Sequence, residues 1–417
     1  MPSVDARSAE AGRARIQWAQ TQMPVLVQVR ERFVRERPLE DVRVAACLHV
    51  TAETANFVQV LLAGGAKVGL CAANPLSTQD DVVAALGGRG GAHVHARRGE
   101  SAQEYAAHVD TLVQHAPQVT IDDGADLIGR IHETDPNAAA EMLGGTEETT
   151  AGLLRVRALE TRGALACPVL AVNESRTERA FNDRFGTGQS TIDGILRATN
   201  LLLAGRTVVV LGYGWTGRGV ALRARGAGAS VVVCEVDPLR ALEARMEGYE
   251  VMPALAAAER GDVFVTVTGG RDVLRTEHFE RMKDGTVLAN AGHFDVEIKL
   301  EDLHALAAGG RHEVLPLVEQ YTLSDGRRLN LLAQGRVVNL AAGEGHPASV
   351  MDVSFAAQAL CVEHLVTHAG ELEARVLQVP EAIDSEVARL KLESLGVRID
   401  ELTGEQRVYR SAWEQGA

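Results

Sequence analysis

Residues 207–235, TVVVLGYGWTGRGVALRARGAGASVVVCE, contain the strongest structural signal in the chain. A β-branched run leads into Gly212, Gly214 and Gly217, and Glu235 ends a second apolar run. In a dinucleotide-binding βαβ unit these glycines permit a tight turn, the approach of a pyrophosphate, and close packing of helix on strand. An acidic residue about twenty positions later binds a ribose 2′-hydroxyl and repels a 2′-phosphate. The stretch therefore predicts a Rossmann unit that binds NAD rather than NADP.

Length and composition indicate a two-domain α/β protein that acts on a small molecule. The 417 residues exceed what one hydrophobic core usually supports, and 46% of them are hydrophobic. A formal net charge of −14 argues against nucleic-acid and membrane partners, because phosphates need a basic surface. Five cysteines without CxxC spacing predict buried thiols, with neither disulfides nor a metal site: Cys47, Cys71, Cys167, Cys234 and Cys361. A charged N-terminus and the lack of a long apolar run predict a cytoplasmic location.

Two series of short apolar runs alternate with helical stretches, which predicts parallel sheets with helices on both faces. The first series has predicted strands at Val42–Cys47, Lys67–Cys71, His93–His95 and Val119–Ile121. The second has a helix at Thr191–Ala204 and predicted strands at Ser230–Cys234, Val263–Thr266, Thr286–Ala289 and Val337–Asn339. We therefore expect two doubly wound domains, with a Rossmann NAD-binding domain (190–345) inserted in a substrate-binding domain (1–189 and 346–378). The charged, amphipathic residues 379–417 predict a helical C-terminal tail that serves oligomerisation.

Polar residues cluster where the predicted strands and apolar runs end, which is where α/β folds bind ligands. The clusters are CLHVTAET (47–54), NPLSTQDD (74–81), DDGADL (122–127), TEETTAG (146–152), NESRTERAFNDRFGTGQS (173–190), TVTGG (266–270), NAGHFDVEI (290–298) and EGHPASVM (344–351). Read in order, they resemble the S-adenosylhomocysteine hydrolase family over essentially the whole chain. The glycine loop and the short tail are most similar to its compact archaeal and thermophilic bacterial branch.

The resemblance implies a homotetramer or dimer and an adenine nucleoside substrate, with NAD+ oxidising C3′ so that the C4′ proton can leave and the 5′ substituent can be eliminated. His49 matches the family's acid/base near the 5′ oxygen, Asp123 the carboxylate that moves the proton, and Glu148 the glutamate that faces the ribose hydroxyls. The substrate contacts implied are Leu48, Thr51, Glu53, His346, Met351 and Phe355. The cofactor contacts implied, with the glycine loop and Glu235, are Thr149, Thr150, Thr216, Thr268, Ala291, Gly292, His293 and Asn339.

One catalytic segment departs from the family pattern Thr-Lys-x-x-Phe-Asp-Asn, whose lysine assists removal of the 3′-hydroxyl proton. Here the lysine position holds Glu178, the aspartate position Asn182, and the asparagine position Asp183. An unpaired charge in a partly buried pocket costs several kcal/mol, so a changed substrate or nearby arginines must compensate. The segment keeps its flanking glycines and phenylalanine, which indicates that its shape is retained while its chemistry changes.

Three functions fit these observations. We expect first an altered enzyme that still eliminates at C5′ of an adenine nucleoside but with a different sugar, acting as a nucleoside 5′-dehydratase whose 4′,5′-exocyclic alkene is of the kind found in nucleoside antibiotics of the angustmycin type. The alternative is hydrolysis of S-adenosyl-L-homocysteine to adenosine and homocysteine, with Glu178 or a neighbour as the 3′-hydroxyl base. A second alternative is an inactive, NAD-bound regulatory relative.

Overall fold

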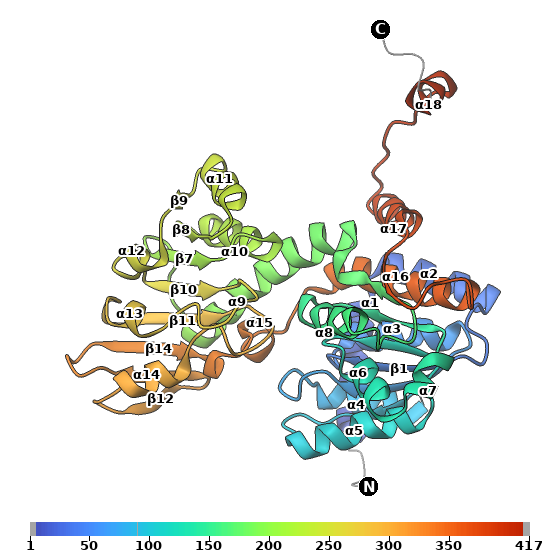
Figure 1. Ribbon diagram of the computed structural model, residues 1–417, viewed down its shortest axis with the longest axis horizontal. Coiled ribbons are helices and arrows are strands. Elements are labelled where there is room, and N and C mark those ends of the chain that lie inside the picture. The colour runs from blue at the N-terminus through green and yellow to red at the C-terminus, as the bar shows by residue number, and fades with distance from the viewer. Residues whose placement is uncertain (1–5, 90, 412–417) are drawn as a thin grey trace.

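The computed structural model describes residues 6–89 and 91–411, which form two sheet-centred halves (Figure 1). The first half is a seven-stranded parallel sheet in the order β15-β6-β5-β4-β1-β2-β3. Its strands are β1 Arg43–Leu48, β2 Lys67–Ala72, β3 His93–His95, β4 Val119–Asp122, β5 Gly144–Glu147, β6 Val169–Ala171 and β15 Val376–Gln378. Its helices are α1 Ala6–Gln20, α2 Pro24–Glu36, α3 Ala52–Ala63, α4 Asp80–Arg89, α5 Ala102–Gln114, α6 Asp126–Thr134, α7 Pro136–Glu141, α8 Thr150–Thr161, α16 Ala348–Thr367 and α17 Glu381–Ser394.

Helices cover both faces of this sheet, as the alternating pattern predicted. The core on one face joins the sheet to α2, α3 and α16, where the rings of Phe57 and Phe355 stack with centroids 4.8 Å apart. On the other face Leu112 of α5 and Ile128 of α6 are buried. Among the described residues α16 alone has the length and apolar composition of a membrane span, yet 67% of its most apolar window is buried inside the protein. It is therefore the central helix of this core.

The second half is an eight-stranded sheet in the order β12-β13-β14-β11-β10-β7-β8-β9. Its strands are β7 Thr207–Leu211, β8 Ser230–Cys234, β9 Glu250–Val251, β10 Val263–Thr266, β11 Thr286–Asn290, β12 Arg311–Leu315, β13 Val318–Thr322 and β14 Arg328–Leu332. Its helices are α9 Gly188–Thr199, α10 Trp215–Gly226, α11 Pro238–Met246, α12 Ala254–Ala258, α13 Thr276–Phe279, α14 Leu300–Leu306 and α15 Val338–Ala341. This sheet is inserted between β6 and β15 of the first, which confirms the predicted architecture, while the exact domain boundaries stay a prediction.

Two local predictions in the second half were wrong. Residues 337–339 form no strand: Val337 makes a single bridge to Asn290, and α15 begins at Val338. The place beside β11 is taken by β14, which pairs with it in parallel and joins β13 and β12 as an antiparallel edge. The helix before β7 also ends at Thr199 instead of 204, because Asn200 adopts a left-handed C-cap conformation with φ 51°.

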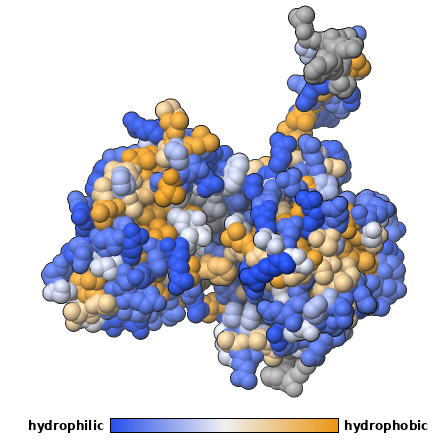
Figure 2. Space-filling model, viewed as in Figure 1, coloured by the Kyte–Doolittle hydropathy of each residue, from blue (hydrophilic) through white to orange (hydrophobic). Residues whose placement is uncertain are grey.

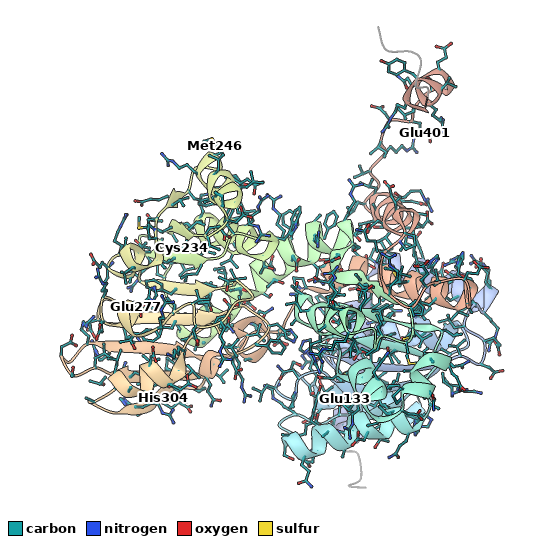
Figure 3. The ribbon with its side chains drawn as sticks, viewed as in Figure 1. Glu133, Cys234, Met246, Glu277, His304 and Glu401 are labelled. Carbon is teal, nitrogen blue, oxygen red and sulfur yellow. The ribbon has the colours of Figure 1, made fainter. Side chains whose placement is uncertain are left out.

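The tail divides into a packed and a projecting part. Ile383 and Val387 of α17 are buried against the first half, so this helix completes the core of its own chain. Beyond it Leu395, Val397 and Ile399 are exposed, and α18 (Gly404–Ser411) stands away from the body, as does the labelled Glu401 (Figures 1 and 3). Apolar residues are also exposed on α11, ending at Met246 (Figures 2 and 3). All five cysteines are free and buried, as predicted.

Candidate active site

Both sheets share one strand arrangement, and it fixes where the polar loops meet. The orders β3-β2-β1-β4-β5-β6 and β9-β8-β7-β10-β11-β14 are each the doubly wound order, whose topological switch points lie between β1 and β4 and between β7 and β10. His49 directly follows β1 and Asp123 directly follows β4. The two side chains therefore meet at the carboxyl end of the first switch point, where such folds bind ligands.

His49 is held between two partners. Its Nδ1 lies 2.6 Å from the Ser77 hydroxyl and its Nε2 lies 3.2 Å from Asp123 Oδ2. Burial lowers the pKa of His49, Asp123 opposes this effect, and His293 adds to it. The imidazole is accordingly neutral near pH 7 and able to accept a proton at this position. The family resemblance singled out His49 and Asp123, whereas Ser77 was noted only as part of the segment that would meet homocysteine, and its contact with His49 was not predicted.

A group of carboxyl side chains lies beside this pair. Burial, followed by the charges of Asp123 and Glu178, raises the pKa of Glu148 well above its usual range. Burial likewise raises the pKa of Glu178 to about 8, although hydrogen bonds with Ser354 and Asn182 partly offset it. Glu148 Oε1 and Glu178 Oε2 are closed to solvent and lack a hydrogen-bond partner in the described part of the chain. Both carboxyls are thus mostly protonated near neutral pH.

The segment that departs from the family pattern forms a π-helix, η2, over Glu178–Thr187. Asn182 Nδ2 donates to Ser354 Oγ over 3.3 Å and lies 3.9 Å from Met351 Sδ, so it faces α16. Burial raises the pKa of Asp183 to about 7, against the charge of Arg179. π-Helical turns are frequent at functional sites because their wider ladder reorients side chains. The three substituted positions therefore lie on one π-helix.

The start of this turn is anchored from the tail, which the sequence did not predict. Asp384 of α17 accepts hydrogen bonds from the backbone N–H groups of Arg176 and Thr177 over 2.8 and 3.1 Å, and one from the Thr177 hydroxyl. Asp384 is 7% exposed. These bonds satisfy N–H groups at the beginning of η2 and tie it to α17. Asp384 carries no sequence signal because its partners lie more than 200 positions away along the chain.

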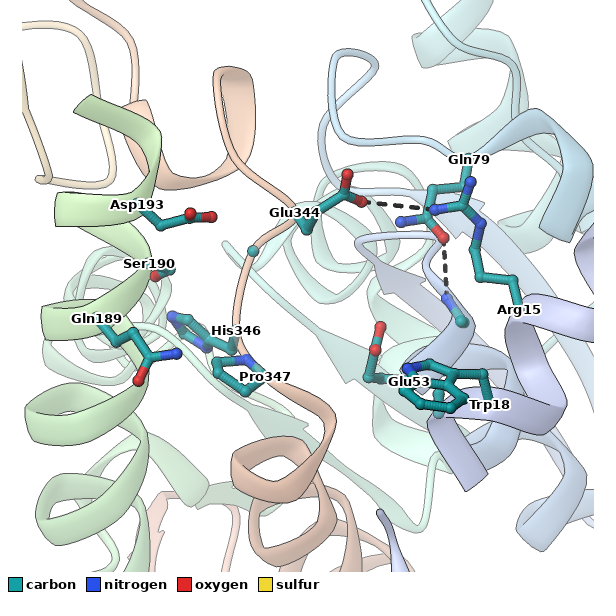
Figure 4. A pocket seen from close by; sticks show the side chains of 13 residues that line it. Arg15, Trp18, Glu53, Gln79, Gln189, Ser190, Asp193, Glu344, His346 and Pro347 are labelled. Carbon is teal, nitrogen blue, oxygen red and sulfur yellow. Dashed lines mark hydrogen bonds and ion pairs between the residues drawn. The ribbon is translucent and has the colours of Figure 1, made fainter. Parts of the chain in front are cut away.

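A cavity of about 330 Å³, here named the base cavity, lies between the two halves (Figure 4). It is lined by Arg15, Trp18, Ala19, Ala52, Glu53 and Gln79 of the first half and by Gln189, Ser190, Asp193, Glu344, Gly345, His346 and Pro347 around the second. Burial raises the pKa of Glu53 and lowers that of His346 to about 4. His346 Nε2 lies 2.9 Å from the Thr187 hydroxyl. Two of the expected substrate contacts, Glu53 and His346, thus share one cavity.

The other expected substrate contacts do not line this cavity. Thr51 caps α3 by accepting from the Thr54 N–H, and it lines a second cavity of about 350 Å³ next to Ser77. Met351 is half-buried beside Asn182. Leu48 and Phe355 are buried in the core of the first half, where Phe355 stacks on Phe57. The structure therefore brings two of the six predicted substrate residues, Glu53 and His346, into the base cavity and a third, Thr51, into the second cavity.

The glycine loop after β7 has the shape that a dinucleotide requires. Gly212 has φ +104°, and a Cβ there would meet the Val267 carbonyl oxygen at 2.7 Å. A Cβ on Gly217 would meet the Gly212 carbonyl oxygen at 2.1 Å, whereas Gly214 has open space, with its nearest neighbour at 3.7 Å. Glu235 accepts from the Tyr213 N–H over 2.7 Å and so braces the loop. Thr216 follows at the second position of α10, whose N-terminus suits a phosphate.

The remaining expected cofactor residues surround this loop and the facing half. Asn339 is 3% exposed and donates to Ser190 Oγ, while its Oδ1 has no partner in the described residues and can accept from an amide such as nicotinamide carboxamide. Thr268 follows β10, while Ala291, Gly292 and His293 follow β11. A Cβ on Gly124 would lie 3.6 Å from His293 Nε2, so His293 reaches the first half. The residues present fit NAD.

Thr149 is the N-cap of α8 and Thr150 is its first residue, so both directly follow Glu148 in the first half. Thr149 donates to Glu147 Oε1 over 2.8 Å, and Thr150 donates to Asn173 over 2.9 Å.

Two buried residues of the second half were missed by the sequence reasoning. Glu297 accepts from the backbone N–H groups of Thr268 and Gly269, and Asn290 bonds Gly292 on both its N–H and its carbonyl. They hold the loops that follow β10 and β11 in place.

Comparison with known proteins agrees with the family resemblance over nearly the whole chain. A family model described as S-adenosyl-L-homocysteine hydrolase matches residues 3–141, and one described as the NAD binding domain of that enzyme matches residues 183–345. An adenosylhomocysteinase of Aquifex aeolicus (strain VF5) is 57% identical over 99% of this chain and 98% of its own length. An S-inosyl-L-homocysteine hydrolase of Methanopyrus kandleri is 53% identical over 99% and 97%. A solved dipicolinate synthase structure from Bacillus halodurans shares the fold, with TM-score 0.51 and 14% identity over 79% of this chain and 99% of its own.

Proposed function

This chain belongs to the S-adenosyl-L-homocysteine hydrolase family and is an NAD-dependent enzyme, and we propose that it hydrolyses an S-nucleosyl-L-homocysteine by elimination and water addition at C5′. The observation that carries this proposal is the His49–Asp123 pair, 3.2 Å apart at the first switch point and steadied by Ser77. Its relatives at 50–57% identity are named for such hydrolyses, one of them on the inosyl compound. The alternative of an inactive regulatory relative is not supported by these names.

The proposed roles divide between proton transfer and binding. Bound NAD supplies reversible oxidation of a sugar hydroxyl, which acidifies the neighbouring C4′ proton. Neutral His49 accepts or returns a proton at the C5′ side, with Asp123 orienting its ring and taking part in the transfer. Glu148, largely protonated, donates a hydrogen bond to a sugar oxygen and so orients the ribose. The side chains of His49 and Asp123 are only 18% and 10% exposed, which limits water to the position that His49 serves.

The second candidate is a nucleoside 5′-dehydratase, and the η2 segment favours it. In the family resemblance a lysine assists removal of the 3′-hydroxyl proton, whereas this chain has a neutral, buried Glu178 there and an Asn182 amide engaged by α16. Loss of water would break the C4′–H and C5′–O bonds and form the 4′,5′ double bond, with the C4′ proton passing by way of the His49–Asp123 pair to the departing hydroxyl, which leaves as water. The changed positions face the sugar in this proposal, while the base cavity and the His49–Asp123 pair are retained.

One experiment separates the two candidates. NAD-loaded protein is incubated with adenosine plus homocysteine, with inosine plus homocysteine, and with adenine nucleosides of altered sugar, and products are followed by mass spectrometry. Hydrolase chemistry run in reverse gives a thioether in one of the first two mixtures. Dehydratase chemistry gives no thioether but a product lighter by one water from a sugar-modified nucleoside. A protein that holds NAD and does neither would refute both candidates.

A triple variant tests the role of the η2 segment. Glu178→Lys, Asn182→Asp and Asp183→Asn together restore the family pattern on the same turn. If the wild-type protein is a dehydratase, the triple variant gains thioether formation from adenosine and homocysteine. If the wild-type protein already forms the thioether, the triple variant changes its rate but creates no new product. NAD content, measured after denaturation, serves as the control for an intact second half.

We propose further that residues 1–189 with 346–378 form the substrate-binding domain, that 190–345 bind NAD, and that 379–417 serve assembly into a homodimer or homotetramer. Support for the assembly comes from the exposed apolar residues beyond α17, including Leu395 and Ile399, which a monomer would leave in water. Removal of residues 395–417 should shift the molecular mass measured by light scattering towards the monomer. An unchanged mass would refute this role of the tail.

A further inference from the structure

Trp18 is the most exposed aromatic side chain among residues 6–89 and 91–411, with 69% of its surface open, and it lies at the rim of the base cavity (Figure 4). Its helix is firmly held: Ile16, Ala19 and Met23 on α1 and its end are buried. Asn56 Nδ2 also donates to the Ile16 carbonyl over 3.0 Å. The exposure of Trp18 is therefore a property of its position and not of a loose helix.

The helix face that carries Trp18 is turned towards the cavity. Arg15, one turn earlier, bonds Asp81 over 3.1 Å and Glu344 over 3.5 Å, so it links α1 to the segment that leads back from the second half. Figure 4 shows this link, with Trp18 and Glu53 on the near wall and His346 and Gln189 across the opening. The indole is thus fixed beside the cavity on an element that contacts both halves.

The chemistry of the cavity wall matches the two kinds of surface on a purine. Glu53, Gln79 and Gln189 offer hydrogen-bonding groups suited to the polar edges of a base. Trp18 is the largest π-surface in the lining, and stacked aromatic rings suit the faces of a base. Leaving an indole in water forgoes the free energy of burying its large apolar area. A planar ligand that covers it accounts for both the exposure and the position.

We propose that Trp18 is a specificity-determining residue that covers one face of the purine base of the substrate in the base cavity. This inference rests on the proposed function, because it takes a purine nucleoside as the substrate. Glu53 then selects the base edge and Trp18 selects a wide bicyclic ring over a pyrimidine. Neither the sugar chemistry nor NAD binding requires the indole.

The test compares Trp18→Ala and Trp18→Phe with the wild-type protein, all loaded with NAD. Calorimetric titration with adenosine and inosine should show that Trp18→Ala weakens purine nucleoside binding by about 5- to 150-fold, the range expected for loss of one base–aromatic stack. Trp18→Phe, which keeps a π-face, should recover most of the affinity. In turnover assays the loss should appear in KM, with kcat and NAD content unchanged.

Three outcomes would overturn the inference. Equal nucleoside affinity in Trp18→Ala and wild type would show that the indole does not contact the base. A fall in affinity that accompanies a change of oligomeric mass in light scattering would assign Trp18 to a contact between copies. A loss that appears in kcat and not in KM would place it in the chemistry. Failure of the proposed function is distinguished beforehand, because the wild-type protein would then bind neither nucleoside.

Discussion

The neutral, buried Glu178 predicts a pH-dependent stability that a single substitution removes. Burial raises the pKa of this carboxyl from 4.5 to about 8. In the unfolded chain the group ionises above pH 4.5, whereas in the folded protein it stays protonated until about pH 8, so the folded state loses stability as the pH rises between these values. Because one pKa unit corresponds to about 1.4 kcal/mol, the penalty is roughly 1 kcal/mol at pH 5 and roughly 4 kcal/mol at pH 8.

Glu178→Gln removes the titration and keeps the shape and the hydrogen-bonding reach towards Ser354. We expect its free energy of unfolding to exceed that of the wild type by about 3 kcal/mol more at pH 8 than at pH 5. The assay is urea unfolding followed by circular dichroism at both pH values, with saturating NAD throughout. Glu31→Gln, on the exposed side of α2, is the matched control. Its difference from the wild type in free energy of unfolding should be the same at pH 5 and pH 8. A Glu178→Gln advantage that is equal at pH 5 and pH 8 would refute the assignment of a neutral carboxyl.

Three further predictions concern the glycine loop with Glu235, and the His49–Asp123 pair. Gly217→Ala should weaken NAD binding at least about tenfold, because its Cβ would lie 2.1 Å from the Gly212 carbonyl oxygen; equilibrium dialysis measures this, and unchanged affinity would show that the loop can yield. Glu235→Gln should narrow the preference for NAD over NADP, measured as the ratio of the two dissociation constants, since a negative charge facing the 2′ position is removed. Ser77→Ala should lower kcat about tenfold without changing NAD content, because His49 loses the partner 2.6 Å from Nδ1; an unaltered kcat would leave Ser77 without a positioning role.

Polar clusters at strand ends, together with the family resemblance, predicted residues that the strand order brings together. His49 and Asp123 each follow a buried strand, and adjacent parallel strands bring such residues to one edge. The glycine loop was predictable because Gly212 and Gly217 serve backbone geometry that few other residues permit. Family membership was correctly inferred from the ordered polar clusters, and the fold class and NAD from the alternating pattern and the glycine loop. The proposed site roles, including those of these residues, stay predictions.

Other features depend on contacts that no local pattern encodes. The protonation of Glu178 results from its burial and from Ser354 on α16, far along the chain. The place beside β11 that was expected for residues 337–339 is taken by β14, and this pairing depends on contacts with β13 and β12 that no local pattern encodes. The sequence indicates a helix around Trp18, but only the fold places that side chain at a cavity.

The insertion of the second sheet between β6 and β15 has an evolutionary consequence. All strands of the second sheet, including β7 before the glycine loop, lie in one continuous stretch of the chain between β6 and β15. The substituted residues at 178–183 lie in the segment that precedes this stretch. The NAD-binding half can therefore stay unchanged during evolution while a few residues just before it are substituted. Recombination at the two crossing segments would exchange the second half between relatives and leave residues 178–183 unchanged. New reactions in this lineage can arise by local editing at the junction, with the costly cofactor machinery retained.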